Sequence, residues 1–471
     1  MKKRVALLAL TAACLSGRIA LADIRIDESA VKSLNVTVYN NGLGLVRDSR
    51  AVNLPAGVST LSFRGVSAQI QPETALLDGD GVSVREQNFN FDLLSRESLL
   101  RKFLGKEIQV IDTHYLSGKK TIENAEILSV DAGLVLKIGD RIETDYNGRL
   151  IFPDVPADLH DQPTLSISVV AETAGDRDLE LSYLTNGLSW RADYVAELNA
   201  AEDALNLNGW VTLTNTSGAA YKNADIRFMA GSVNRVLPVR PRAFRAKGLM
   251  LAAAPTADNA MAEEQVMDYH LYTLGRKTDI ESNQTKQLAL LSASNVKVGK
   301  EYRFADVLPV YRGDSFSGET PDRNAEVVLE FDNTKAANLG LALPAGTIRV
   351  YKANAKKNMF FVGEDRISHT PENGKIKLHL GNAFDVTVSG RETAYTAFSP
   401  KAYEASYSLT FKNAKDIPVS VKYGQTFSNQ WSVSSSSLPY ETKNARQAEW
   451  TVKIPAKGQS VLNFTVRVQK P

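Results

Sequence analysis

Short runs of alternating apolar and polar residues, separated by turn residues, constrain the fold of this chain more than any other feature. Residues 36–39 (Val-Thr-Val-Tyr) precede Asn40-Asn41-Gly42, and residues 82–85 (Val-Ser-Val-Arg) follow Asp78-Gly79-Asp80-Gly81. A period of two is typical of antiparallel strands with one buried face, because successive side chains point to opposite sides of a sheet. Asn-Gly and Asp-Gly pairs favour tight turns between such strands. The pattern predicts a mainly β fold.

One segment has helical spacing instead. Within residues 93–105, a helix is predicted to begin near Ser95, a residue type favoured at helix N-termini. It is predicted to end at Gly105, because glycine favours helix termination. The apolar residues between these ends recur at helical spacing: Leu93, Leu94, Leu99, Leu100, Phe103 and Leu104. We therefore predict a multi-module antiparallel β-sandwich or barrel protein with one connecting helix.

Turn signals and shifts in composition divide the 471 residues into several modules. Residues 249–266 lack both β-branched density and a consistent helical face, which favours a flexible insertion. The predicted modules are 1–22, a signal peptide; 23–92, an N-terminal β-sandwich-like module; 93–105, the connecting helix; 106–160, a small β-barrel-like insert; 161–242, a core β module; 243–298, a flexible insertion and return segment; 299–400, a β-sandwich module; and 401–471, a C-terminal β-sandwich-like module.

Three strand-like runs end in an asparagine followed by a small residue, at Asn215, Asn333 and Asn413. Asparagine tolerates the left-handed backbone conformation of a turn that closes a strand. The recurrence is expected wherever the strands of a sandwich end, so we interpret it as shared architecture and not as proof of duplication.

Residues 1–22 follow the secretory pattern. A basic start at residues 2–4 precedes an apolar run over residues 5–15, and Ala20-Leu21-Ala22 offers a cleavage site. The apolar run is too short to span a bilayer, and no later stretch approaches the roughly 18 apolar residues of a membrane helix. We expect an exported, periplasmic protein with no transmembrane helix in its mature chain.

The only cysteine, Cys14, lies within this segment. Its context resembles a bacterial lipoprotein signal, but Thr11 stands where such signals usually have an aliphatic residue. Ordinary cleavage is therefore our prediction, and lipidation of Cys14 is the alternative. In either form the mature chain has no cysteine pair for a disulfide or a zinc–thiolate site.

The charge balance argues against a nucleic-acid partner. The chain has 55 Lys and Arg against 53 Asp and Glu, and four of the basic residues lie in residues 1–22. The mature chain therefore keeps 51 basic residues and a formal charge of −2. Nucleic-acid binding usually needs a basic field, which this balance does not supply.

Two motifs in the strongest β block, residues 181–194 with Ser-Trp-Arg-Ala-Asp-Tyr at 189–194 and residues 209–215 (Gly-Trp-Val-Thr-Leu-Thr-Asn), resemble a known family. The similarity continues through residues 343–346 (Leu-Pro-Ala-Gly) and 381–386 (Gly-Asn-Ala-Phe-Asp-Val). On these motifs the chain resembles a bacterial exported domain-of-unknown-function family that also includes mucoidy-inhibitor A-like proteins. The resemblance covers about residues 164–470. The resemblance implies a β-sandwich protein of the bacterial envelope and no particular reaction. The long coiled coils found in some members of the family are missing from this sequence.

No reaction-defining motif is present. Gly-x-Ser-x-Gly, phosphate-loop and dinucleotide patterns are missing, and Asp78-Gly79-Asp80-Gly81 lacks the other ligands of a calcium loop. The histidines do not share the three- or four-residue spacing of a helical metal site, so we predict no metal and no cofactor. The five are His114, His160, His270, His369 and His379.

Acidic and aromatic residues leave two alternatives open. A hydrolase of envelope glycan or peptide would need two carboxylates brought together by the fold, and sequence alone does not select the pair. The acidic residues on or beside expected strands are Glu86, Glu180, Asp193, Glu197 and Asp225. Trp190 and Trp210, with Tyr183 and Tyr194, could form a platform for sugars or a peptide, but a sandwich core also needs large aromatic residues. We predict core packing for both tryptophans and name no catalytic residue.

A basic strip over residues 235–247 is the best candidate interaction region. Its prolines disfavour a helix, and Leu249, Met250 and Leu251 follow it. The predicted binding residues are Arg235, Arg240, Arg242, Arg245 and Lys247. An extended strip of this kind could meet an envelope protein or an anionic envelope polymer, and a solvated linker explains it almost as well. The sequence thus favours a non-enzymatic binding or scaffold protein over the hydrolase, with a structural spacer as a third possibility.

Overall fold

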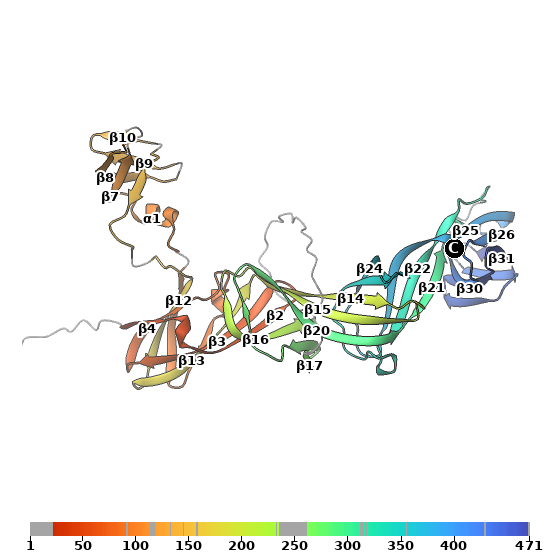
Figure 1. The fold of residues 1–471 in the computed structure, drawn as a ribbon, viewed down its shortest axis with the longest axis horizontal. Coiled ribbons are helices and arrows are strands. Elements are labelled where there is room, and N and C mark those ends of the chain that lie inside the picture. Colours follow the sequence, from red (N-terminus) through yellow and green to blue (C-terminus); the bar gives the residue numbers. More distant parts are fainter. Residues whose placement is uncertain are drawn as a thin grey trace, which may run out of the picture.

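The computed structural model describes residues 22–90, 93–113, 118–131, 133–144, 146–156, 159–231, 233–234, 261–310, 315, 318–354, 356–427 and 430–469. The fold is mainly β, with 67% of residues in strands and 4% in helical conformations, which confirms the predicted fold class. The sheets follow one another along an elongated body, and one small sheet stands apart near one end (Figure 1). None of the helices in the described part of the chain has the length and apolar composition needed to cross a membrane.

The first sandwich pairs a four-stranded sheet with part of an eight-stranded one. The four-stranded sheet has the order β1 (Ala22–Ile26), β4 (Gly57–Arg64), β12 (Thr164–Ala171) and β6 (Val82–Asn90). The larger sheet has the order β17 (Ala262–Val266), β18 (Tyr269–Thr273), β16 (Tyr221–Ala230), β2 (Val31–Tyr39), β3 (Leu43–Leu54), β13 (Gly175–Asn186) and β5 (Leu76–Asp78), with β19 (Thr278–Ile280) beside β16. Short 3₁₀ helices η1 (Glu28–Ala30) and η2 (Pro72–Thr74) lie in its connections.

A five-stranded sheet carries the motifs at residues 189–194 and 209–215, while residues 181–186 lie on β13. Its order is β20 (Gln284–Lys297), β15 (Ala204–Asn215), β14 (Leu188–Leu198), β23 (Gly346–Ala353) and β24 (Met359–Ile367). One face of it joins the core of the first sandwich, and this shared core extends from Ile26 to Leu378. Glycines make room for a buried ring there, because a Cβ at Gly209 would lie 3.1 Å from Tyr194 and one at Gly346 would lie 2.9 Å from it. The Gly-Trp and Pro-Ala-Gly motifs thus serve close packing around Tyr194.

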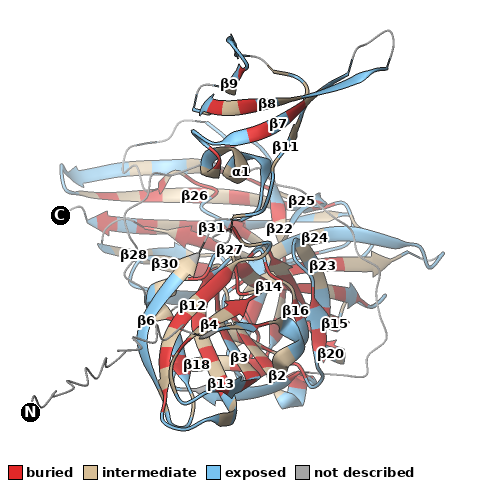
Figure 2. Ribbon diagram, turned by 90° about the vertical axis from the view of Figure 1, so that its left-hand side faces the viewer, coloured by how far each residue is buried: buried red, intermediate tan, exposed pale blue. Residues whose placement is uncertain are grey.

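A nine-stranded sheet forms the other end of the body. Its order is β28 (Gln430–Ser436), β31 (Gly458–Gln469), β26 (Ala402–Asn413), β25 (Lys375–Ser399), β22 (Arg323–Asp332), β21 (Gly299–Ala305), β27 (Val419–Thr426), β30 (Gln447–Ile454) and β29 (Tyr440–Asn444). The long strand β25 connects two cores, since Ile376 and Leu378 belong to the first core and Val386 and Val388 to a second one around Trp450. In Figure 2 the buried residues alternate with exposed ones along these strands.

The predicted helix is confirmed as α1 (Arg96–Lys102), with Ser95 as its N-cap and Gly105 in a left-handed conformation just beyond it. It precedes a five-stranded sheet with the order β10 (Arg141–Glu143), β9 (Val135–Ile138), β8 (Lys120–Ser129), β7 (Glu107–Thr113) and β11 (Arg149–Ile151). Phe103 packs into this sheet's separate small core. The sheet path is open in the described residues, with β10 and β11 at its edges, so the insert is not a closed barrel.

The strands do not divide between sheets as the predicted modules do. β12 and β13, placed in module 161–242, pair with β4 and β3 of module 23–92. β25 and β26 lie on opposite sides of the predicted boundary at residue 400 and pair in one sheet. The predicted flexible insertion and return segment, 243–298, contains strands β17 to β20, and β17 lies within the residues 249–266 expected to be flexible.

The three strand-ending asparagines are buried and act through their side chains. Asn215 donates to the carbonyls of Ala219 and Glu281 at 2.8 and 2.9 Å. Asn413 likewise donates to the carbonyls of Ile417 and Pro455 at 2.8 and 3.0 Å. Asn333 donates to the carbonyl of Leu341 at 2.6 Å and accepts from the N–H of Gly340 at 3.1 Å, both in the loop that follows β22. None of the three has a positive φ, so the predicted left-handed turn is wrong as an explanation. Asparagine instead supplies hydrogen-bond partners for loop backbone that folds over the strand end.

Candidate functional site

The predicted basic strip lies outside the described residues: Arg235, Arg240, Arg242, Arg245 and Lys247 all fall within residues 235–260, as do Leu249, Met250 and Leu251. The strip therefore stays a prediction. His114 also lies outside the described residues. Among the residues that the structure does describe, no group of three or more His, Cys, Asp or Glu side chains is arranged to hold a metal ion.

The histidines that can be placed make ordinary polar contacts. Nδ1 of His270 lies 2.7 Å from Oε1 of Glu263, and Nδ1 of His379 lies 2.7 Å from Oε1 of Glu326. His369 accepts a hydrogen bond at Nδ1 from the backbone N–H of Ala345, at 3.2 Å. Burial lowers the pKa of His369, and the nearby His270 lowers it further.

The four aromatic residues considered as a platform are separated by the fold. Trp190 is buried, packs against Phe228 with ring centroids 5.4 Å apart, and donates from Nε1 to the carbonyl of Met229 at 3.2 Å. Tyr183 and Tyr194 are buried too. Trp210 is only half-buried, and in the strand register it pairs with Asp193. The prediction of core packing is thus confirmed for Trp190 and wrong for Trp210.

Alternation along β14 explains this separation. Leu188, Trp190, Ala192, Tyr194, Ala196 and Leu198 form the inner face, which packs into the first core. The odd-numbered residues of β14 and their neighbours on the adjoining strands point the other way. We call this opposite surface the outer face, and its main residues are Arg191, Asp193, Trp210, Thr212, Gln287, Arg349, Tyr351, Phe361 and Glu364.

Asp193 is the buried centre of the outer face, with only 7% of its surface exposed. Its Oδ2 accepts hydrogen bonds from Nε of Arg191 at 3.0 Å and from the hydroxyl of Thr212 at 2.7 Å. Its Oδ1 accepts from Nη1 of Arg349 at 3.2 Å, and Nε of Arg349 lies 3.1 Å from Oε2 of Glu364. The carboxylate thereby holds two arginines in fixed positions on the sheet.

Aromatic side chains flank this polar centre. Trp210 lies directly across from Asp193 in the register, and Tyr351 lies four residues beyond the position that faces Asp193 on β23. At about 3.3 Å per residue, this offset corresponds to about 13 Å along the strands. Tyr351 meets Phe361 of β24 edge to face, with ring centroids 5.7 Å apart. The outer face therefore offers aromatic groups at two positions with charged groups between them.

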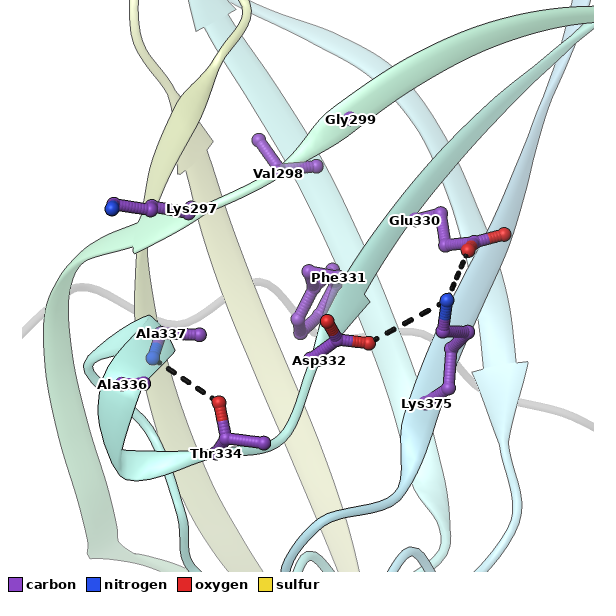
Figure 3. Close-up of a pocket in the computed structure, with 10 residues that line it drawn as sticks. All are labelled: Lys297, Val298, Gly299, Glu330, Phe331, Asp332, Thr334, Ala336, Ala337 and Lys375. Carbon is purple, nitrogen blue, oxygen red and sulfur yellow. Dashed lines mark hydrogen bonds and ion pairs between the residues drawn. The ribbon is translucent and has the colours of Figure 1, made fainter.

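A groove of about 370 Å³ lies elsewhere, where η4 (Lys335–Ala337) and the end of β22 meet the start of β21 (Figure 3). Its charges are mutually neutralised, because Nζ of Lys375 lies 2.7 Å from Glu330 and 3.7 Å from Asp332, while Lys377 lies 3.0 Å from Glu330. Lys297 points away from this cluster in Figure 3. Burial would raise the pKa of Glu330, but hydrogen bonds from Lys375 and Lys377 outweigh it and lower the pKa. The groove holds a satisfied ion cluster and no poised acid.

The five acidic candidates are spread over four strands. Glu86 and Glu197 are exposed, Glu180 pairs with Arg47 at 2.7 Å, and Asp225 lies 3.8 Å from Lys277. Asp193 and Glu197 share the outward side of β14, but four residues correspond to about 13 Å, whereas a glycosidase pair lies within about 5 to 9.5 Å.

No protein-family model and no curated protein matches this chain.

The outer face was missed as a site by sequence reasoning. The signal that could have found it was the strict alternation in residues 189–195, where Arg191 and Asp193 stand between apolar neighbours that face the core.

Proposed function

We propose that this chain is a non-enzymatic binding protein of the bacterial cell envelope, and that it binds an anionic, sugar-containing polymer on the outer face. The observation that carries the proposal is that the half-buried Trp210 pairs in the strand register with Asp193, whose carboxylate binds two arginines on an open sheet surface. An indole ring packs well against the apolar face of a sugar. An open sheet also suits an extended chain better than a small enclosed ligand.

The arginines give the surface a preference for negative charge. Arg191 uses Nε for Asp193, and 66% of its side chain is exposed, so its terminal nitrogens face solvent. A guanidinium whose position is fixed in advance can donate two hydrogen bonds to a carboxylate or phosphate with little loss of side-chain entropy. The envelope location in this proposal is supported by the secretory pattern of residues 1–22 and by the resemblance of residues 164–470.

The hydrolase alternative has less support from the chemistry of the carboxyl groups. Glycoside hydrolysis needs one carboxylic acid whose pKa is raised so that it stays protonated. In the described residues, the Asp and Glu carboxyl groups with a shifted pKa are Glu202, Glu330 and Glu441, and all three are shifted downward beside lysines.

The elongated series of sheets also fits a scaffold, which is compatible with binding along the body (Figure 1).

The test measures binding of the purified full chain to soluble polygalacturonate, an anionic polysaccharide, and to its methyl ester, which lacks the charge. We expect the wild-type chain to prefer the acid form. Trp210→Ala should weaken binding to both forms, whereas Arg191→Ser should weaken only binding to the acid. The matched control is Arg47→Ser, because Arg47 is also half-exposed and paired with an acid but lies in a different sheet. Unchanged binding by both outer-face variants would overturn the proposal.

A further inference from the structure

The tip of the β23–β24 hairpin exposes four consecutive apolar side chains. The exposed fractions are 49% for Met359, 52% for Phe360, 54% for Phe361 and 37% for Val362. Isolated exposed apolar residues are common on protein surfaces, but contiguous ones mark sites of contact with another molecule or a membrane. Figure 2 shows β24 at the side of the body, coloured mostly as exposed.

The position of β24 explains why these side chains stay uncovered. β24 is an edge strand of its sheet and, among the described strands, pairs only with β23. Gly363 fixes the strand against β25, because a Cβ there would lie 2.4 Å from the carbonyl oxygen of Leu380. Residues 359–362 lie on the hairpin-tip side of this close approach, where none of the described sheets covers the four side chains.

The apolar side chains lie on both faces of the hairpin. Phe361 is opposite Tyr351 and Met359 is opposite Ala353, whereas Phe360 is opposite Lys352 and points to the other side. A protein partner that packs on a sheet needs one apolar face. A tip that is apolar on both sides fits a medium that surrounds it, which is how side chains enter the boundary between headgroups and acyl chains of a bilayer.

The charge of the tip indicates which surface it meets. Residues 352–362 contain Lys352, Lys356 and Lys357 and no acidic residue. Lys352 is held by Glu202, with Nζ 2.5 Å from Oε1, but Lys356 and Lys357 have no ion pair with any residue that the structure describes. Two exposed lysines beside an apolar tip complement the negative headgroups of anionic phospholipids, and their long stems reach from the apolar layer to that level.

We propose that the β23–β24 tip binds the surface of an anionic phospholipid bilayer, with Met359 to Val362 entering the interface and Lys356 and Lys357 contacting the headgroups. Phe361 belongs to both the tip and the outer face. Polymer binding is tested through Trp210 and Arg191, which lie on β15 and β14, so the two interactions can be tested separately. It would place the outer face next to a membrane.

The experiment measures sedimentation of the purified full chain with vesicles of phosphatidylcholine alone and with vesicles that also contain phosphatidylglycerol. We expect binding to the anionic vesicles and a roughly tenfold or larger loss for Phe360→Ser/Phe361→Ser, because two phenyl rings no longer leave water. Lys356→Glu/Lys357→Glu should abolish the preference for phosphatidylglycerol. The matched control is Phe384→Ser, since Phe384 is 90% exposed but lies on β25.

Two results would overturn the proposal: no binding of the wild-type chain to anionic vesicles, or equal binding by the tip variants. A third would also do so, namely a fall in molar mass in solution on Phe360→Ser/Phe361→Ser, because it would show that a second copy of the chain covers the tip. Far-UV circular dichroism checks that each variant folds. If the phenylalanine variant does not fold, the lysine variant still tests the proposal. Trp210→Ala should bind vesicles normally, so failure of the polymer proposal remains distinguishable.

Discussion

The inner and outer faces of the five-stranded sheet are built by the same strands but use opposite chemistry. On the inner face, Trp190 and Tyr194 are buried against other sheets, and Tyr194 donates its hydroxyl proton to the carbonyl of Pro344 at 2.8 Å. On the outer face, Asp193 lies between them on β14, and Trp210 of β15 pairs with Asp193 on the same open side of the sheet. Stability and the proposed recognition therefore depend on different residues of a single strand, and a substitution on one face can be compared with a substitution on the other.

The largest expected effect is on the inner face. Trp190→Ala should lower the free energy of unfolding by about 3–5 kcal/mol, because it leaves a cavity beside Phe228 and Tyr272 and removes the bond to Met229. Urea denaturation followed by far-UV circular dichroism measures this loss. A loss no greater than that of Trp210→Ala would break the distinction between the two faces.

The next effect is at the centre of the outer face. Asp193→Ala should cost about 1–3 kcal/mol, because Thr212 loses its acceptor and two guanidinium groups lose the carboxylate that orders them. Asp193→Asn should cost less, since its amide oxygen can still accept from Thr212. The same denaturation measurement applies. Equal stability of all three proteins would show that the cluster is not ordered as described.

Sequence reasoning succeeded where a local pattern decides the structure. The period-two runs became strands, and Ser95 and Gly105 lie at the two ends of α1. It could not separate Trp190 from Trp210, because both are large aromatic residues in strands and their faces depend on which strands pair. Register is set by contacts between distant segments, such as the parallel pairing of β14 with β23.

The module boundaries differ for the same reason. Turn residues mark where a strand ends, but they do not tell which sheet the next strand joins. β12 follows the insert and returns to lie between β4 and β6, which come before it in the chain. The asparagine recurrence was recognised, yet its cause lay in loop backbone that folds back over each strand end, as Asn413 shows with Ile417 and Pro455.

A smaller effect on stability, with a clear effect on binding, is expected for Trp210. Trp210→Ala should change the free energy of unfolding by less than about 1.5 kcal/mol, since the ring is half-buried and lies outside the core. Its binding to polygalacturonate should nonetheless fall about tenfold, which corresponds to about 1.4 kcal/mol. Titration by isothermal calorimetry, beside Arg47→Ser, measures the change. A large loss of stability with normal binding would reverse the roles assigned to the two faces.

The smallest expected effect is a pH dependence at the border of the inner face. His369 accepts from the N–H of Ala345, which follows the Pro344 that binds Tyr194. Burial first, and then the neighbouring His270, lower the pKa of His369 below its ordinary value of 6.5. The unfolded chain therefore takes up a proton at a higher pH than the folded chain does, and stability should decrease as the pH falls below about 6.5.

His369→Asn tests this coupling, because an amide oxygen can replace Nδ1 as an acceptor for Ala345 but does not titrate. Thermal unfolding at several values between about pH 7.5 and pH 5.5 should show a steeper fall in Tm for the wild-type chain than for the variant. His379→Asn is the matched control, since His379 lies on β25 and contacts Glu326 of β22, away from Ala345. Parallel Tm curves for the wild-type chain and His369→Asn would mean that protonation of His369 costs the folded state nothing, and that the inner face keeps its packing independently of this border.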